Sequence, residues 1–313
     1  MGTAEFAVPS LAALGQNGHQ VVAVVTQPDK PQGRGRSLHA SPVKRYALEK
    51  ELELFQPRRV RSASFQDKMS ALQPDLLVVA AFGQIVPQSL LDLPKVAPIN
   101  VHGSLLPKYR GAAPIQHSII NGESETGVTT MWMDATLDTG DIILAESTPI
   151  LAADDVSSLT VRMAEMGARL LLQTIHSFLE GTVERQPQED AVSSQAPAIQ
   201  PSDGYLDWSQ SATQLNCRIR GVSPKPGAYT FIDGKRLKLW KTEPVLSELS
   251  TLAGVVLEIA RGQGGVLVQA GNRSALRLIE VQPENGKRMC ASDWARGSRL
   301  QIGATFDSNL QEG

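Results

Sequence analysis

The pattern of the sequence changes at about residue 182, and this change constrains the fold more than any other feature. Before it, runs of apolar residues alternate with stretches of helical periodicity, as in an open α/β sheet that binds ligands at the carboxyl ends of its strands. Residues 182–203 lose all periodicity and are rich in Gln, Pro and Ser, which predicts a linker over the surface. After residue 203 short strand-like runs dominate. We therefore expect two domains, at 1–181 and 204–313, joined by 182–203.

The first domain alternates predicted strands and helices. Apolar or β-branched runs predict strands at 21–26, 75–82, 99–102, 127–133 and 142–147. Helical patterns cover 5–14, 43–52, 113–120 and 155–180. In the last of these helices apolar residues recur at spacings of three to five, and we expect its Met163 and Met166 to face the core. This order predicts a Rossmann-like sheet.

The second domain reads as a small all-β unit. Residues 228–232 and 236–241 flank Asp233-Gly234, a strong hairpin signal. Three further strands are expected at 254–259, 265–270 and 275–281, after one helix at 212–219. Five short strands with one helix predict a C-terminal β-barrel of the oligonucleotide-binding (OB-like) kind.

Composition and charge exclude several classes of protein. Apolar residues make up 42% and charged residues 20%, as in soluble globular domains, and no run reaches the roughly 20 apolar residues of a membrane span. The 30 basic and 32 acidic residues exclude a polycation. They are unevenly placed, however, at 16 against 22 in residues 1–203 and 14 against 10 in 204–313, so a local basic patch could still contact nucleic acid.

The cysteines and histidines indicate the compartment and exclude a metal centre. Cys217 and Cys290 lie far apart in a chain too large to need a disulfide scaffold, which favours a reducing cytoplasm. The five His and two Cys show no metal-ligand spacing, so we expect no metal.

Three polar residues are candidates for catalysis. Asn100 and His102 lie two apart at the end of a predicted strand, so their side chains share a face. An amide donor beside an imidazole can stabilise an oxyanion and transfer a proton. Asp138, in the turn "LDTGD", could orient that imidazole. Taken separately, the first two could equally make structural hydrogen bonds, and an Asp in a turn is commonly a turn former.

Two long motifs change this balance. The segments "HGSLLPKYRGAAPIQ" and "ETGVTTMWMDATLDTGD" together resemble the formyltransferase family that takes a one-carbon unit from the co-substrate 10-formyltetrahydrofolate. The resemblance implies that Asn100, His102 and Asp138 form the catalytic trio. It also implies a folate site made by "SLLP" and by part of "AAFGQIVP". The residues it assigns to folate are Ser104, Leu105, Leu106, Pro107, Phe82, Gly83 and Ile85.

Further segments choose among the branches of that family. The basic segment "TQPDKPQGRGRSLHASPVK" at 26–44 and the segment at 203–241 resemble the branch that formylates methionyl initiator tRNA. By charge alone, the first would be a solvated flexible loop. The resemblance implies translation initiation, a cytoplasmic monomer and contacts to tRNA. The candidate contacts are Lys30, Arg34, Arg36, Lys44, Arg218, Arg220, Lys225, Lys235, Arg236 and Lys238.

Two rival functions and one structural expectation stay open. A formyltransferase of the same family could act on an amino-sugar nucleotide, or the chain could be a non-catalytic RNA-binding protein; the basic loop disfavours the first and the trio disfavours the second. Members of the family begin with a short apolar strand before a Gly-Thr turn, whereas this chain begins at Met1 and that turn. We therefore expect one further strand, of about five to seven residues, upstream.

Overall fold

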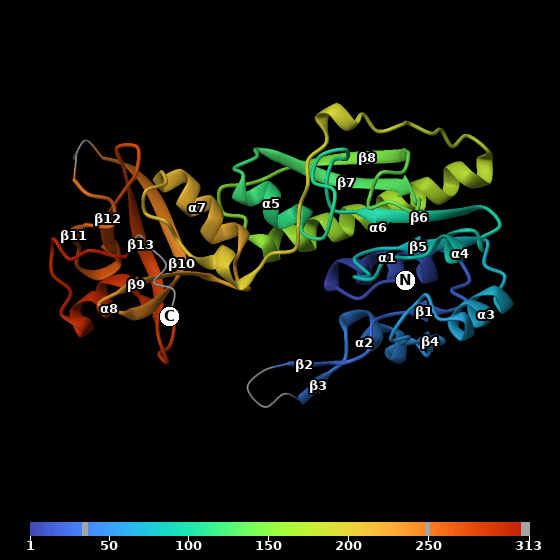
Figure 1. The fold of residues 1–313 in the computed structure, drawn as a ribbon, viewed down its shortest axis with the longest axis horizontal. Coiled ribbons are helices and arrows are strands. Elements are labelled where there is room, and N and C mark those ends of the chain that lie inside the picture. The colour runs from blue at the N-terminus through green and yellow to red at the C-terminus, as the bar shows by residue number, and fades with distance from the viewer. Residues whose placement is uncertain (33–36, 248–250, 308–313) are drawn as a thin grey trace. The chain divides into compact units, whose positions relative to one another are not determined.

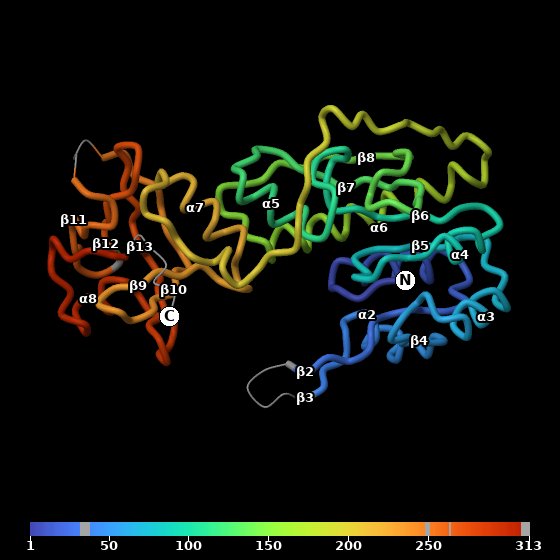
Figure 2. The backbone as a smooth tube through the Cα atoms, viewed as in Figure 1, coloured from blue at the N-terminus to red at the C-terminus, as the bar shows by residue number. Residues whose placement is uncertain are grey.

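The computed structural model of the chain describes residues 1–32, 37–247 and 251–307 and divides them between two compact units (Figures 1 and 2). The first unit comprises Met1–Pro114, Glu125–Pro149 and Ser158–Pro197. The second comprises Ile115–Ser124, Ile150–Ser157 and the chain from Ala198 onward. Residues 182–197, predicted as a linker, therefore pack with the first unit.

The first unit is built on a mixed four-stranded sheet of order β5-β6-β7-β8. β5 and β6 are parallel, whereas β6, β7 and β8 run antiparallel. Two short pairs lie outside this sheet, β1 parallel to β4 and β2 antiparallel to β3. The strands are β1 (Val24–Val25), β2 (Lys30–Gln32), β3 (Ser37–His39), β4 (Leu54–Phe55), β5 (Leu76–Val79), β6 (Ala97–His102), β7 (Glu125–Trp132) and β8 (Ile142–Pro149).

The predicted helices of this region are confirmed with small shifts at their ends. Ser41 caps α2 by accepting a hydrogen bond from the Lys44 amide at 3.0 Å. Met163 and Met166 of α6 are buried, as expected. The sequence patterns missed α3 and the short elements α4, β2, β3 and β4. The helices are α1 (Val8–Gln16), α2 (Pro42–Glu49), α3 (Ala63–Ala71), α4 (Gln88–Leu91), α5 (Pro114–Ile120) and α6 (Val156–Glu180), with 3-10 helices at Glu5–Ala7 and Asp190–Val192.

The first residues of the chain lie between β1 and β5, which form no ladder with each other among the described residues. The Gly2 amide donates to Val25 O at 2.9 Å, and the Met1 ammonium donates to Val78 O at 2.6 Å. Burial lowers the pKa of this ammonium to about 5. A cleft of about 290 Å³, lined mainly by apolar side chains of β1, β5 and α1, continues from this point. The upstream strand stays a prediction.

The second unit is an antiparallel sheet of order β11-β12-β13-β10-β9, with β14 paired to β13. The predicted hairpin is confirmed, with Asp233-Gly234 at the turn between β9 and β10. The elements are 3-10 helix Pro201–Gly204, α7 (Ala212–Gly221), β9 (Ala228–Ile232), β10 (Lys235–Leu246), β11 (Val256–Ile259), 3-10 helix Gly262–Gly264, β12 (Val266–Ala270), β13 (Ser274–Pro283), β14 (Met289–Cys290) and α8 (Ala291–Ser298).

The core of this sheet is apolar, with Trp208, Leu215 and Phe306 fully buried in it. Backbone groups of residues 303–307 bond both to β11 and to Phe231 of β9. No ladder joins β9 to β11 in the described part of the chain, so closure into a barrel stays a prediction. No helix among the described residues is long and apolar enough to cross a membrane. Both cysteines are free thiols.

Candidate active site

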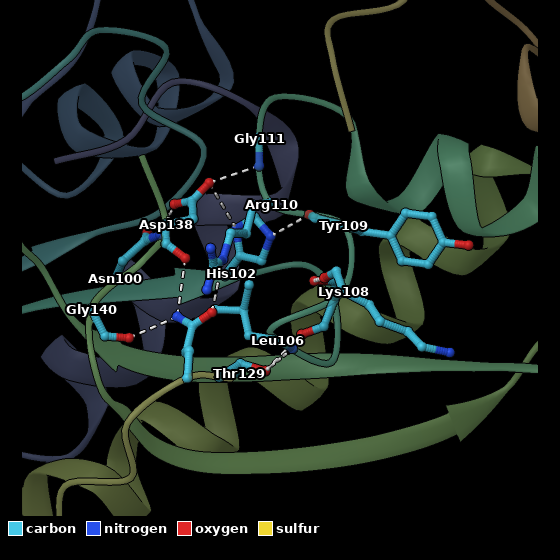
Figure 3. Close-up of polar contacts among 12 residues, drawn as sticks. Asn100, His102, Leu106, Lys108, Tyr109, Arg110, Gly111, Thr129, Asp138 and Gly140 are labelled. Atoms are coloured by element: carbon cyan, nitrogen blue, oxygen red, sulfur yellow. Dashed lines mark hydrogen bonds and ion pairs between the residues drawn. The ribbon is translucent and has the colours of Figure 1, made fainter. Parts of the chain in front are cut away.

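Three polar side chains meet where β6 ends. Strand alternation places Asn100 and His102 on one face, where they are 9% and 5% exposed. Asn100 Nδ2 donates to Asp138 Oδ1 at 3.2 Å, and His102 Nδ1 lies 3.7 Å from Asp138 Oδ2 (Figure 3). The structure therefore brings together the three residues that the sequence singled out, across 38 residues of chain.

The orientation of the imidazole is fixed by a backbone carbonyl. His102 Nε2 lies 2.9 Å from Tyr109 O. A carbonyl oxygen can only accept, so Nε2 carries a hydrogen and donates it. The other nitrogen, Nδ1, faces the carboxylate of Asp138. Any proton that His102 takes up or gives away in this geometry is therefore exchanged at Nδ1.

Asp138 is held by its carboxylate and by its backbone. Its φ is +56°, a left-handed conformation that costs a non-glycine residue about 1 to 2 kcal/mol. Oδ2 accepts from the Gly111 amide at 2.9 Å. Gln188 Nε2 donates to Asp138 O at 3.0 Å and to Gly140 O at 2.7 Å. The sequence patterns missed Gln188, because a lone Gln in an aperiodic polar segment carries no signal.

The "SLLP" segment follows His102 directly and is tied to the sheet, with Leu106 bonded to Thr129 (Figure 3). Ser104 is fully buried, and its Oγ donates to Lys108 O at 2.6 Å. Thr129 Oγ1 of β7 donates to Ser104 O at 2.7 Å and accepts from the Leu106 amide at 3.1 Å. The segment that ends at Pro107 is thus a rigid wall, in which the Ser104 hydroxyl is already engaged.

The three candidates from "AAFGQIVP" differ in how they meet solvent. Phe82 is 3% exposed and packs in the apolar core with Val25 and other side chains. Gly83 offers its carbonyl to Gln27 Nε2 at 2.7 Å. Ile85 is 71% exposed. Of the three, Ile85 alone presents a side chain that a ligand could reach directly.

The basic loop candidates are only partly within the described residues. Arg34 and Arg36 lie outside them. Lys30 is exposed, whereas Lys44 Nζ is 2.7 Å from Asp29 Oδ2. Hydrogen bonds from Lys44 and Gln56 lower the pKa of Asp29. Lys44 therefore forms an ion pair with another residue of the same segment.

The basic candidates of the second unit fall into two groups. Arg218 Nη1 donates to Asp203 O at 3.2 Å, and Arg220 Nη1 donates to Leu151 O and Asp154 O at 3.2 and 2.9 Å. Both guanidinium groups are thus engaged with main-chain carbonyls. Lys225 and Lys235, by contrast, are exposed.

The remaining candidates, Arg236 and Lys238, lie on the outward side of β10, and Arg288 lies between β13 and β14. Residues 236, 238 and 240 alternate with the buried Leu237 and Leu239 of β10. The Arg236 guanidinium lies 3.7 Å from the Tyr229 ring centroid, and that of Arg288 lies 4.4 Å from the Trp240 ring centroid. The sequence patterns missed the aromatic members, although period-two spacing could have revealed Trp240. We call this set the basic face: Tyr229, Arg236, Lys238, Trp240 and Arg288.

No group of three or more His, Cys, Asp or Glu side chains in the described part of the chain could hold a metal ion.

Comparison with known proteins identifies the family. Residues 1–175 match the formyl transferase family, and residues 198–299 match the formyl transferase C-terminal domain. The chain is 46% identical over 303 residues to the methionyl-tRNA formyltransferase of Geobacter sulfurreducens, covering 97% of this chain and 94% of that protein. It is 44% identical over 313 residues to that of Solibacter usitatus, covering 100% and 98%.

Solved structures agree at the level of the fold. An N-formyltransferase from Helicobacter canadensis, crystallised with folinic acid and dTDP-3-aminofucose, superposes with a TM-score of 0.65 at 20% identity, covering 89% of this chain and 97% of that one. HypX from Aquifex aeolicus with tetrahydrofolic acid gives 0.57 at 17% identity, covering 82% and 44%. With both domains matched in order along its length, the chain belongs to the formyl transferase family.

Proposed function

We propose that this chain transfers the formyl group of 10-formyltetrahydrofolate to the α-amino group of methionine carried by initiator tRNA. The observation that carries the proposal is 46% identity over 97% of the chain to a methionyl-tRNA formyltransferase. The match extends through the C-terminal domain, so it includes more than the catalytic half.

Asn100 and His102 supply the electrostatic part of the reaction. When the amine attacks the formyl carbon, negative charge develops on the formyl oxygen. Only Asp138 accepts from the Asn100 amide among the described residues, and a second N–H on Nδ2 is left for this oxygen. Once His102 has taken up the proton of the attacking amine, its positive charge stabilises the same oxygen.

Asp138 supplies the other half of the chemistry. The attacking amine must lose a proton, and Nδ1 of His102 is the nitrogen that can receive or relay it, since Nε2 is bonded to Tyr109 O. The carboxylate 3.7 Å from Nδ1 stabilises the imidazolium that results. When the tetrahedral intermediate collapses, the bond between the formyl carbon and N10 of the folate breaks. The imidazolium returns its Nδ1 proton to N10, so tetrahydrofolate leaves as a neutral amine and no covalent enzyme intermediate forms.

The folate co-substrate would lie along the segment from Ser104 to Pro107. Tethering of this segment to Thr129 makes a fixed wall next to Asn100 and His102, and exposed Ile85 adds an apolar contact. The buried Phe82 would act indirectly, by supporting the loop that carries Gly83.

The tRNA would be held by the basic loop at 26–44 and by the basic face. Arg236 and Lys238 on adjacent outward positions of β10 can contact phosphates, while Trp240 offers a stacking surface. Lys225 and Lys235 are exposed and can add to this contact. A cytoplasmic monomer is part of the proposal. The two free thiols favour a reducing compartment, and the mass of the protein in solution would check the oligomeric state.

The decisive experiment is a formylation assay with methionyl initiator tRNA and 10-formyltetrahydrofolate. It compares the 313-residue chain with a version extended upstream by one apolar strand. Formyl-methionyl-tRNA from either protein is the expected result. No product from either would refute the proposal, and product from the extended form alone would show that the first sheet has to be completed.

A further inference from the structure

We infer that Gln188 is a positioning residue for Asp138. We also infer that residues 186–196, which we call the bracing segment, fix the backbone of the loops that carry the candidate site, through hydrogen bonds. The turnover consequences of this inference rest on the proposed function, but its structural basis does not. Residues 182–203 were predicted as a linker over the surface, and the hydrogen bonds of residues 186–196 tie this part of the chain to the candidate site.

The bracing segment begins with a backbone pair to the sheet. Gln186 exchanges two hydrogen bonds with Ile142 at the start of β8, at 2.8 and 3.0 Å. Two residues later, the side chain of Gln188 uses both of its N–H groups and its oxygen. Its two N–H groups go to Asp138 O and Gly140 O, and its Oε1 accepts from Arg110 Nε at 2.9 Å. The side chain is thus a bracket between the Asp138 turn and Arg110.

This bracket acts where the backbone of Asp138 needs support. A left-handed residue at φ +56° persists only when its surroundings hold it. The Asp138 carboxylate is bonded to Asn100 and Gly111, whereas the backbone carbonyl of Asp138 accepts a hydrogen bond from Gln188. Removing the two N–H donors would release the turn that aims the carboxylate at His102.

Arg110 links this bracket to the imidazole. Its side chain is buried, and Nη1 donates to Asp190 Oδ1 at 2.8 Å. Its backbone bonds to Ser194 O and to the Ala196 amide at 2.8 and 2.7 Å. On either side of Arg110 are Tyr109 O, which accepts from His102, and the Gly111 amide, which donates to Asp138.

The fit between this tripeptide and the bracing segment is close. Gly111 has φ +124°, and a Cβ on it would lie 2.7 Å from Ala196 O. The Tyr109 amide donates to Ser194 Oγ at 2.9 Å. Residues 109–111 and the bracing segment therefore form one unit, which sets both the imidazole and the carboxylate.

The test replaces Gln188 with residues that keep its size but lose its donors. Gln188→Glu retains the contact to Arg110 and places a carboxylate against two carbonyls; Gln188→Met has no polar atom. Both should lower kcat between about 10-fold and 100-fold. The KM values for co-substrate and tRNA should not change, since a positioning residue acts through Asp138 rather than on either substrate. Gln173→Met is the matched control, because this glutamine is exposed on α6 and lies outside the bracing segment.

A double-mutant cycle separates positioning from a general loss of folding. If Gln188 acts through the carboxylate, adding Gln188→Met to Asp138→Asn should lower kcat less than twofold further. A full 10-fold further loss would overturn the inference, as would unchanged kcat in both single variants.

A second readout needs no substrate. The Gly111 amide donates to Asp138 Oδ2, so its hydrogen exchange should be at least about 10-fold faster in Gln188→Met, with unchanged exchange in α6. Unchanged Gly111 exchange overturns the inference even if the enzyme is active. If neither the unmodified chain nor its extended version formylates tRNA, the proposed function is refuted. Faster Gly111 exchange in Gln188→Met would still support the inference.

Discussion

The site at the end of β6 and the basic face on β9 and β10 both gather polar side chains, but they organise them in opposite ways. Asn100 and His102 are buried, and each has a partner that fixes its orientation. On the basic face, Lys238 is half-buried and Arg236 lies against an aromatic ring. In the candidate active site, hydrogen bonds fix the side chains before any ligand binds. On the basic face, the cations stay partly exposed.

This difference predicts where single substitutions should have the largest effect. In a buried, prearranged site each group acts in a low dielectric and has no substitute. On a charged surface each cation contributes a small, salt-screened share. A single substitution in the site at the end of β6 should therefore cause a large loss of activity, whereas a single substitution on the basic face should cause a small loss of tRNA affinity.

The largest effect is expected from removing a member of the trio. Asn100→Ala and His102→Ala should each lower kcat by about 10²-fold to 10³-fold, because a prearranged donor or charge is lost next to the developing oxyanion. Binding of the folate co-substrate, measured by titration calorimetry, should remain detectable.

The control for this change is His176→Ala, an imidazole on α6 whose side chain is 68% exposed. It should leave turnover unchanged. Near-normal kcat in either Asn100→Ala or His102→Ala would contradict the assignment of the site.

A smaller effect concerns the buried ammonium that Met1 has in the 313-residue chain and that the version extended upstream lacks. Burial lowers its pKa to about 5 in the folded chain, against an ordinary value of about 8, so between these pH values the unfolded chain binds more protons. Stability should then rise with pH, by about 2 kcal/mol from pH 6 to pH 8. Denaturant unfolding of protein that retains Met1, confirmed by mass, measures this.

N-terminal acetylation provides the matched control, since it removes the titrating group and the adjoining cleft has room for it. The acetylated protein should lose this part of the pH dependence. Equal slopes for the free and acetylated proteins would show that the ammonium is solvated.

The smallest effect is expected on the basic face. Arg236→Ala should weaken tRNA binding by several-fold and reduce the salt dependence of log K by about 1, as for the loss of one phosphate contact. Arg220→Ala is the comparison, because its guanidinium bonds to Leu151 O and Asp154 O. That change should destabilise the fold by about 1 to 2 kcal/mol and leave tRNA affinity unchanged.

Filter binding at several salt concentrations, together with thermal unfolding, would check both variants. Equal losses of affinity in Arg220→Ala and Arg236→Ala would mean that engaged and surface arginines contribute alike. The contrast between the two regions would then not extend to individual cations.

Local patterns predicted the elements whose stability is local. The long helix α6, with its repeating apolar face, and the hairpin at Asp233-Gly234 are both confirmed. Short pieces such as β4 were missed, because two residues carry no periodicity. The antiparallel direction of β7 and β8 was also not readable, since strand direction depends on pairing across the sheet.

The sequence by itself determined which three residues are candidates for catalysis and that an α/β half precedes a β-rich half, because those signals lie in contiguous motifs and in the period of apolar residues. Only the tertiary structure decided what holds the trio in place. Gln188 and Arg110 come from parts of the chain 78 residues apart. Hydrogen bonds between such distant groups arise from packing in three dimensions, and no local pattern encodes them.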